Sequence, residues 1–367
     1  MRNLHKIVLT PIVLVLLGLL IGVAARAQDS SPPEIAPEFV GATEDWINTK
    51  PLKMSDLRGK VVLVDYWEYT CVNCIRTLPY LKEWQKRYAK DGLVIVGIHT
   101  PEFEFAKDRK NVAQAVKSLG ITWPVLVDSA YKNWQAYNNS YWPRKYFIDK
   151  TGRIVADHAG EGGYEESEAR IQQLLKQLNP KLTFPKPMTA IRDTDKPGAV
   201  CYPVTPEMYV GERGEFYNQH GNIMPYQSGI SDTFKDSGGP YADGKIYAQG
   251  EWKMERESLR HARTTTDIAT DYVAIRYHAL ECNAVIKPEG SKPFTVFIFQ
   301  DGKPLPKADA GADIQYNDQG QSFIQVAEPR MYRLTKNAKF GSHDLRMATM
   351  SPDFGLYSFT FSSCEMK

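Results

Sequence analysis

The sequence has 367 residues, which exceeds the size that one hydrophobic core usually serves, so we expect two folded domains. Hydrophobic residues make up 43% and charged residues 24%, a composition that excludes a disordered chain. The 45 basic and 43 acidic residues leave a net charge of +2, which is too balanced for a surface that holds nucleic acid or an anionic bilayer.

The first 27 residues have the pattern of a signal peptide. Arg2 and Lys6 precede an apolar run, and Ala25-Arg26-Ala27 supplies the small-x-small pattern that a signal peptidase reads. We expect cleavage and a periplasmic or otherwise exported location, where disulfides persist; retention of the run as an N-terminal anchor is the alternative. No later stretch is long and apolar enough to span a bilayer, so we expect no integral membrane segment after cleavage.

After a linker at residues 28–36, residues 37–180 alternate short apolar runs with segments of helical period. Val61-Val62-Leu63-Val64 predicts a buried strand, and it is followed by a helix, a second strand and a second helix, an order typical of a parallel sheet covered on both faces. The remaining expected elements are a strand at residues 124–127, a short helix around Trp134, a hairpin that turns at residues 149–152, and a helix that stops before Pro180.

Residues 181–199 are a second, proline-rich linker, and the pattern changes beyond it. Helical period is scarce in residues 200–367, while alternating runs recur between Gly, Pro, Asp and Asn clusters. These runs lie at residues 272–277, 280–286, 294–299 and 356–361. We therefore expect an α/β domain followed by an all-β sandwich of the jelly-roll kind.

The chemistry is expected at Cys71-Val72-Asn73-Cys74, which follows a buried strand and opens a helix. Backbone N–H groups and the helix dipole at that position favour a thiolate on Cys71, and Cys74, one turn later, can attack a mixed disulfide formed there. Half of a zinc site would need a second ligand pair, which the sequence does not offer. A plain structural disulfide is the other alternative, but the strand-CxxC-helix context favours redox function.

These residues resemble the thioredoxin-fold proteins of the exported TlpA-like class, and more closely the thioredoxin-like part of the DipZ family. The resemblance implies that residues 200–367 are similar to that family's carbohydrate-binding-module-like sandwich. The DipZ family has a multi-span membrane portion that passes electrons across the bilayer, and no such stretch occurs here, so we expect a separate membrane electron-transfer protein as partner. The matching segments lie at residues 46–49, 57–60, 64–74, 99–103, 141–143, 205–211, 250–252 and 357–361.

The same resemblance implies roles for further residues. Pro143 corresponds to the cis-proline that faces the cysteine pair and positions a substrate strand, and Trp142 before it would contact substrate or pack in its loop. Asp65 lies six residues before Cys71 in an apolar strand, so its carboxyl should have a raised pKa and suit it to take the proton of Cys74. Pro79 is expected to kink the helix rather than take part in chemistry.

Three nearby polar residues are weaker candidates. His99 and Glu102 follow the second strand, whose end shares the carboxyl edge of the sheet with Cys71, so both could line the cleft, although solvated or capping roles fit equally well. Glu68, three residues before Cys71, would raise the pKa of that thiol by its negative charge.

In the second domain, Cys282 lies among apolar residues, as an inert core cysteine does. Cys201 and Cys364 lie near the two ends of that domain, which suggests a stabilising disulfide between them. Four aromatic residues could stack on a glycan ligand, but such side chains are more often core; they are Tyr209, Tyr217, Tyr226 and Trp252.

The sequence therefore predicts an exported thiol-disulfide oxidoreductase, working as a reductase on the thiols and disulfides of envelope proteins. It needs no dissociable cofactor and no metal, because the cysteine pair stores the two electrons. The alternatives are a disulfide oxidase or isomerase, a copper chaperone that binds through Cys71, Cys74 and His99, and a glycan-binding module of the cell envelope.

Overall fold

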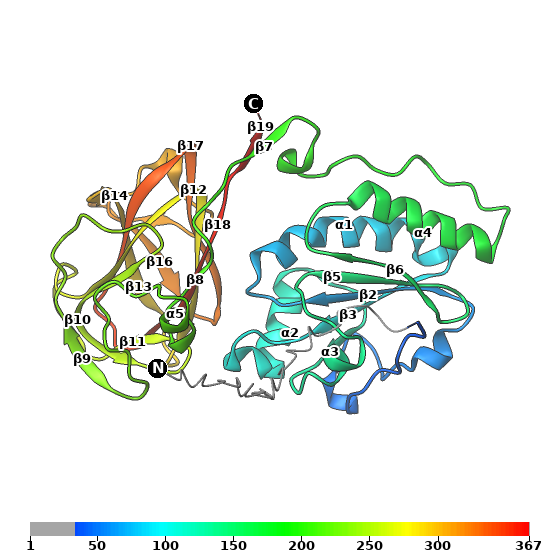
Figure 1. Cartoon of the computed structure of the whole chain (residues 1–367), viewed down its shortest axis with the longest axis horizontal. Coiled ribbons are helices and arrows are strands. Elements are labelled where there is room, and N and C mark those ends of the chain that lie inside the picture. Colours follow the sequence, from blue (N-terminus) through cyan, green and yellow to red (C-terminus); the bar gives the residue numbers. More distant parts are fainter. Residues whose placement is uncertain (1–33, 367) are drawn as a thin grey trace, which may run out of the picture.

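The computed structural model describes residues 34–366 of the chain. The predicted signal peptide therefore lies outside the described residues, as does most of the first linker. Two units are connected by an extended segment, and the first of them contains the Cys71 region (Figure 1). Among residues 34–366, none of the helices combines the length and the apolar character that a membrane crossing needs.

The first unit is a six-stranded mixed sheet with helices on it. The strands lie in the order β1-β4-β3-β2-β5-β6; β2, β3 and β4 are parallel, whereas β1, β5 and β6 pair antiparallel. The parallel centre and the hairpin confirm the predicted order of elements. The elements are β1 (Trp46–Ile47), β2 (Val61–Trp67), α1 (Val72–Tyr88), β3 (Leu93–His99), α2 (Arg109–Ser118), β4 (Val125–Val127), α3 (Lys132–Ala136), β5 (Arg144–Ile148), β6 (Ile154–Ala159) and α4 (Tyr164–Leu178).

Both faces of this sheet are buried, as the continuous apolar run of β2 predicts. Leu63 and Trp67 belong to a core that includes side chains of α1, α2 and α4. Val64 and Tyr66, which point to the other face, pack in a second core with residues such as Tyr137. Because both faces of the sheet are covered, polar side chains within β2, such as Asp65, are removed from water.

The second unit is built mainly from strands, with one short α-helix and a 3-10 helix at Lys307–Asp309. Its elements are β7 (Ala199–Cys201), β8 (Met208–Tyr209), α5 (Glu212–Phe216), β9 (Ser231–Phe234), β10 (Ile246–Met254), β11 (Leu259–His261), β12 (Tyr272–Pro288), β13 (Phe294–Gln300), β14 (Lys303–Pro304), β15 (Gln315–Tyr316), β16 (Ser322–Val326), β17 (Arg330–Thr349), β18 (Phe354–Ser362) and β19 (Cys364–Met366).

Eleven of these strands form one hydrogen-bonded sheet that curls around a single core (Figure 1). The apolar runs at residues 272–277 and 280–286 are two halves of the single strand β12, interrupted by register shifts after Ala279 and Cys282. The first half of β12 pairs with β10 and the second half with β18, so the long strand passes from one layer to the other. The predicted sandwich is thus continuous through β12 rather than split into two separate sheets.

The two ends of the second unit meet in a small two-stranded sheet of β7 and β19. Cys201 lies opposite Cys364 in that pairing, and the two are joined by a disulfide, which confirms the predicted bond. Cys282 is fully buried in the core with a free thiol, as expected of an inert cysteine.

Candidate functional site

Cys71 and Cys74 lie at the start of helix α1, next to the end of β2. Cys71 caps the helix: its sulfur accepts a hydrogen bond from the backbone N–H of Cys74 at 3.2 Å. The Cys71 side chain is partly exposed, whereas Cys74 is completely buried behind it, and both are free thiols. The predicted strand-CxxC-helix geometry is therefore present, with one thiol that reaches the surface and one that does not.

Burial raises the pKa of the Cys71 thiol, and hydrogen bonds from the Cys74 thiol and backbone lower it by less. The carboxylates of Glu68 and Glu102 raise it further, as expected for Glu68. The start of the helix was expected to favour a thiolate on Cys71. Here the desolvation of the thiol by burial outweighs that effect, so the pKa is raised. Burial and the hydrogen bond to Cys71 raise the pKa of Cys74 still more.

Asp65 lies in the middle of β2, completely buried, and neither of its carboxyl oxygens has a hydrogen-bond partner among the described residues. Burial raises its pKa from 3.8 to about 7, while the positive charge of Lys145 acts in the opposite direction. The carboxyl also interacts electrostatically with the Cys74 thiol and raises its pKa. The raised pKa expected of Asp65 is therefore found, while its role as the acceptor of the Cys74 proton stays a prediction.

Lys145 is a residue of the site that the sequence reasoning missed. It lies on β5 directly opposite Asp65 in the strand register, it is completely buried, and its Nζ donates to the carbonyl of Gly160 at 3.3 Å. Burial lowers its pKa, and Asp65 opposes that shift. The sequence did contain a signal for this residue. Lys145 directly precedes the apolar run Tyr146-Phe147-Ile148, and a lysine buried in such a strand usually has a charged partner.

The loop before β5 borders the cysteine pair. The Trp142–Pro143 peptide bond is cis, as the resemblance implied, and Pro143 is buried. The Trp142 ring packs on that of Trp134 with centroids 4.3 Å apart, and another part of it lines the cleft beside Cys71. Trp142 is thus packed in its loop and also lines the cleft, while its contact with substrate stays a prediction.

Glu68 and His99 are buried beneath the site. The His99 ring lies 3.6 Å from a carboxyl oxygen of Glu68 and stacks on Tyr69. The other carboxyl oxygen of Glu68 accepts the backbone N–H of Thr70 at 2.6 Å. His99 was expected as a possible cleft residue, but it is completely buried away from the cleft, because the ring of Tyr69 covers it.

The cleft itself is a hollow of about 250 Å³ with walls from both units. Cys71, Asn73 and Trp142 line it on the first unit, together with Glu102, as expected of that residue. Glu207, Tyr209 and Arg213 of the second unit form the opposite wall, which no pattern in the sequence predicted. Burial raises the pKa of both carboxyls, those of Glu102 and Glu207, and their mutual repulsion raises that of Glu207 further.

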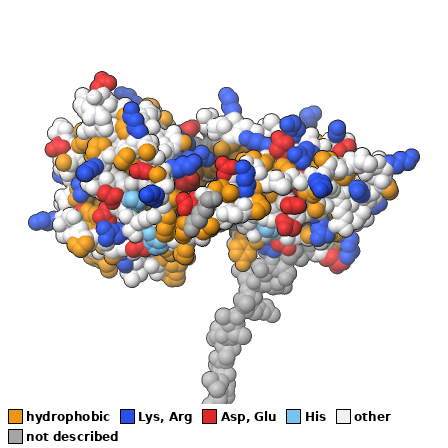
Figure 2. Space-filling view, turned by 90° about the horizontal axis from the view of Figure 1, so that it is seen from above, with side chains coloured by type: hydrophobic (Ala, Val, Ile, Leu, Met, Phe, Trp, Pro, Cys, Tyr) orange, Lys and Arg blue, Asp and Glu red, His pale blue; other side chains and the backbone are white. Residues whose placement is uncertain are grey.

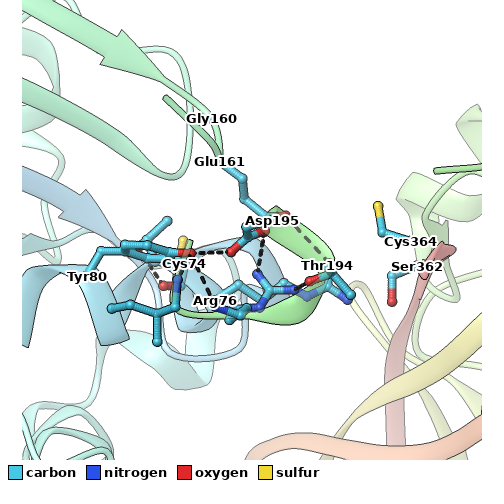
Figure 3. A network of polar contacts seen from close by, with 12 residues as sticks. Cys74, Arg76, Tyr80, Gly160, Glu161, Thr194, Asp195, Ser362 and Cys364 are labelled. Carbon is cyan, nitrogen blue, oxygen red and sulfur yellow. Dashed lines mark hydrogen bonds and ion pairs between the residues drawn. The ribbon is translucent and has the colours of Figure 1, made fainter. Parts of the chain in front are cut away.

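Charged contacts fix the second unit against helix α1. Arg76, on the first turns of α1, reaches Glu281 of β12 at 3.0 Å and Glu161 at 3.5 Å. Arg192, in the connecting segment, binds the same Glu161 at 3.2 Å. Figure 3 labels Arg76 and Glu161 in this network. Hydrogen bonds from Ser362 and Arg76 hold the pKa of Glu281 below its ordinary value, although burial opposes them.

Of the four aromatic residues considered for glycan stacking, three are core residues: Trp252 is fully buried, and Tyr226 and Tyr209 nearly so. Tyr217 is the exposed one, at 53%. Within residues 34–366 there is no group of three or more His, Cys, Asp or Glu side chains that could hold a metal ion.

Comparison with known proteins matches both units. The family described as Redoxin matches residues 34–175, and the family described as Thioredoxin like C-terminal domain matches residues 205–362. The chain is 35% identical over 272 residues to Protein DipZ of Mycobacterium bovis, covering 73% of this chain and 37% of that protein. It therefore spans little more than a third of the length of that relative.

Shorter relatives match the first unit. The chain is 30% identical over 139 residues to the thiol-disulfide oxidoreductase ResA of Bacillus cereus, covering 38% of this chain and 76% of ResA. Among solved structures, a thiol-disulfide isomerase from Corynebacterium glutamicum is similar at 23% identity with a TM-score of 0.34, covering 38% of this chain and 96% of that one.

Proposed function

We propose that this chain, which belongs to the thioredoxin-like thiol-disulfide oxidoreductases, reduces protein disulfides through Cys71 and Cys74. The observation that supports the proposal most is the different location of the two thiols. Cys71 lines the cleft, whereas Cys74 lies buried behind it next to Asp65. Such an arrangement suits a nucleophile that meets the partner and a second thiol that resolves the intermediate.

In the proposed reaction, the Cys71 thiolate attacks one sulfur of a partner disulfide, which forms a mixed disulfide and releases the other partner sulfur as a thiolate. Asp65 then takes the proton of Cys74, and the resulting thiolate attacks the Cys71 sulfur. The partner leaves with both sulfurs reduced, and the chain holds a Cys71–Cys74 disulfide, so two electrons have passed. With a pKa of about 7, the Asp65 carboxyl can accept a proton and return it near neutral pH.

The raised pKa of the Cys71 thiol supports a reductase rather than an oxidase. An oxidising cysteine pair gains its potential from a strongly stabilised thiolate, which stabilises the reduced form. Here burial and the carboxylates of Glu68 and Glu102 destabilise the thiolate, so the pair gives up its electrons more readily. The oxidase and isomerase alternatives are correspondingly less favoured.

The setting of the reaction is also part of the proposal. We infer that the chain is exported by the signal peptide expected at residues 1–27, acts on envelope proteins in the periplasm, and is re-reduced by a membrane electron-transfer protein, as the resemblance to the DipZ family implies. A glycan ligand for the second unit is a weaker proposal, because three of its four candidate aromatic residues are buried.

Replacement of the resolving thiol tests the chemistry. The Cys74→Ser variant should remain covalently attached to a disulfide-bonded protein substrate, seen as a reducible adduct on a gel, because nothing can attack the mixed disulfide. Cys71→Ser should form no adduct. Cys282→Ser is the matched control, since Cys282 is also free and buried but lies in the other core, and it should reduce substrate like the wild type. Adducts on Cys282, or on the Cys71→Ser variant, would contradict the assignment.

A further inference from the structure

A further cavity lies between the two units, separate from the cleft beside Cys71. It has a volume of about 350 Å³ and shares none of its lining residues with that cleft. Its wall on the first unit includes Ile75 of α1 and Leu119 at the end of α2, and its wall on the second unit includes Met331 of β17. Because Tyr69 lines the same space, we call it the Tyr69 cavity.

Direct contacts between the units keep the two walls of this cavity in place. The ring of Tyr357, on β18, packs edge-on against those of Phe103 and Phe105, with centroids 5.3 and 4.8 Å apart. The Arg76–Glu281 ion pair joins the two units as well. Figure 2 shows charged side chains of both signs on the two lobes where they adjoin. Since these contacts do not depend on a ligand, the cavity is formed before a ligand binds, as is usual for small-molecule sites.

Tyr69 supplies a buried polar group that lacks a partner. The residue is 3% exposed, and its hydroxyl has no hydrogen-bond partner within residues 34–366. Its ring is held in place because it stacks on His99 and meets Phe105 edge-on. Burial raises the pKa of Tyr69, and nearby carboxylates, among them that of Glu328 on the cavity wall, raise it further. The hydroxyl therefore stays protonated and can donate a hydrogen bond to a ligand in the cavity.

The charged side chains of the cavity wall are paired or exposed. Arg330 donates to Asp313 at 2.8 Å and lies 3.4 Å from a carboxyl oxygen of Glu328. The other oxygen of Asp313 accepts the backbone N–H of Arg333 at 2.7 Å. Arg333 itself is exposed, so its guanidinium stays hydrated. A charged ligand would lose its hydration here without gaining an unpaired buried counter-charge, so the wall favours a neutral ligand.

We propose that the Tyr69 cavity binds a small, neutral, amphipathic molecule that carries a carbonyl group. Its apolar body covers Ile75, Leu119 and Met331, and its carbonyl oxygen accepts a hydrogen bond from the Tyr69 hydroxyl. The cavity volume is at the lower end of the range of about 300–1,000 Å³ that is typical of small-molecule sites, which suits a single ring with short substituents. Binding is favourable because apolar surface is covered and a buried hydroxyl gains its partner. This site is additional to the dithiol chemistry of the proposed function.

Two probes of the same shape test the inference. Acetophenone is a neutral aryl ketone, and isopropenylbenzene has a methylene group in place of the ketone oxygen. In saturation-transfer NMR titrations of the whole chain, both should bind saturably, and acetophenone more tightly. Tyr69→Phe should weaken the binding of acetophenone roughly fivefold and leave that of isopropenylbenzene unchanged, because it removes the donor and keeps the ring. Tyr164→Phe is the matched control: Tyr164 is also buried but does not line the cavity, so both affinities should stay at the wild-type value.

A second variant tests the location of the site. Ala115, on α2, lines the cavity and is nearly buried, so Ala115→Phe should fill the space and abolish the binding of both probes. If Ala115→Phe fails to fold, the comparison of the two probes on Tyr69→Phe decides alone. The proposal is wrong if neither probe binds the wild type, if Tyr69→Phe weakens both probes equally or neither, or if binding survives in folded Ala115→Phe. The proposed function stands in each of these cases, since neither Cys71 nor Cys74 lines the cavity.

Discussion

Replacing Asp65 with asparagine should remove a loss of stability that the wild type undergoes as the pH rises. The carboxyl has a pKa of about 7 in the folded chain, against 3.8 for an exposed aspartate. Below pH 3.8 it is protonated in both states and contributes nothing to their difference. Between these two pKa values only the unfolded chain ionises, so the free energy of unfolding falls as the pH rises. Above the folded pKa both states are ionised, and the loss is complete.

The size of this effect follows from the two pKa values. Each unit between them contributes about 1.4 kcal/mol, so the wild type should lose about 4 kcal/mol of stability across the window, and Asp65→Asn should lose none of it. A buried amide without a partner imposes a penalty of its own, but that penalty does not change with pH. The pH dependence of the difference between the two proteins is therefore the quantity to measure.

Denaturant unfolding at about pH 4, about pH 6 and about pH 8 provides the assay. Six of the seven tryptophans lie in the first unit, so their fluorescence reports mainly on its unfolding. Asp56→Asn, at an exposed position of the same unit, is the control and should follow the wild type. A constant difference between Asp65→Asn and the wild type over this range would show that the carboxyl does not titrate there, and its role as proton acceptor would be refuted.

Three other variants give expected outcomes. Lys145→Met removes the cation that lowers the pKa of the buried carboxyl, so the fall in stability should extend to higher pH in the same unfolding assay, and an unchanged midpoint would exclude the pairing. The double variant Cys201→Ala, Cys364→Ala opens a loop with a sequence separation of 163 residues, so the second unit should lose up to about 5 kcal/mol in calorimetry while the first keeps its transition; equal losses in both units would contradict this. Arg76→Ala removes an ion pair between the units, so limited proteolysis of the connecting segment at residues 179–198 should become faster; no change would mean that the pair does not hold the units together.

The sequence predicts the features that depend on neighbouring residues better than those that depend on contacts between distant segments. The strand before Cys71 and the helix after it follow from local hydrophobic period, and their geometry was predicted correctly. The two runs of β12 were taken as separate because the register shifts that join them depend on neighbouring strands. Such shifts leave no clear mark in the residues of one strand.

The candidate site divides in the same way. The burial of Asp65 could be predicted because its own strand is apolar, whereas its partner Lys145 comes from β5 and is brought opposite only by strand pairing. The wall formed by Glu207 and Arg213 depends on how two units pack, and no spacing within either unit contains that information. The prediction that His99 could line the cleft was wrong. Its position at the sheet edge is as expected, but the ring of Tyr69, from another loop, covers it.

A redox titration of the free thiols tests the central claim most directly. Equilibrated in glutathione buffers of increasing potential and then alkylated, the protein should lose Cys71 and Cys74 together in a single two-electron step, with Cys282 remaining reduced throughout, as mass spectrometry of the labelled peptides would show. Independent one-thiol changes at Cys71 and Cys74, or a pair that stays reduced at every potential, would contradict the account.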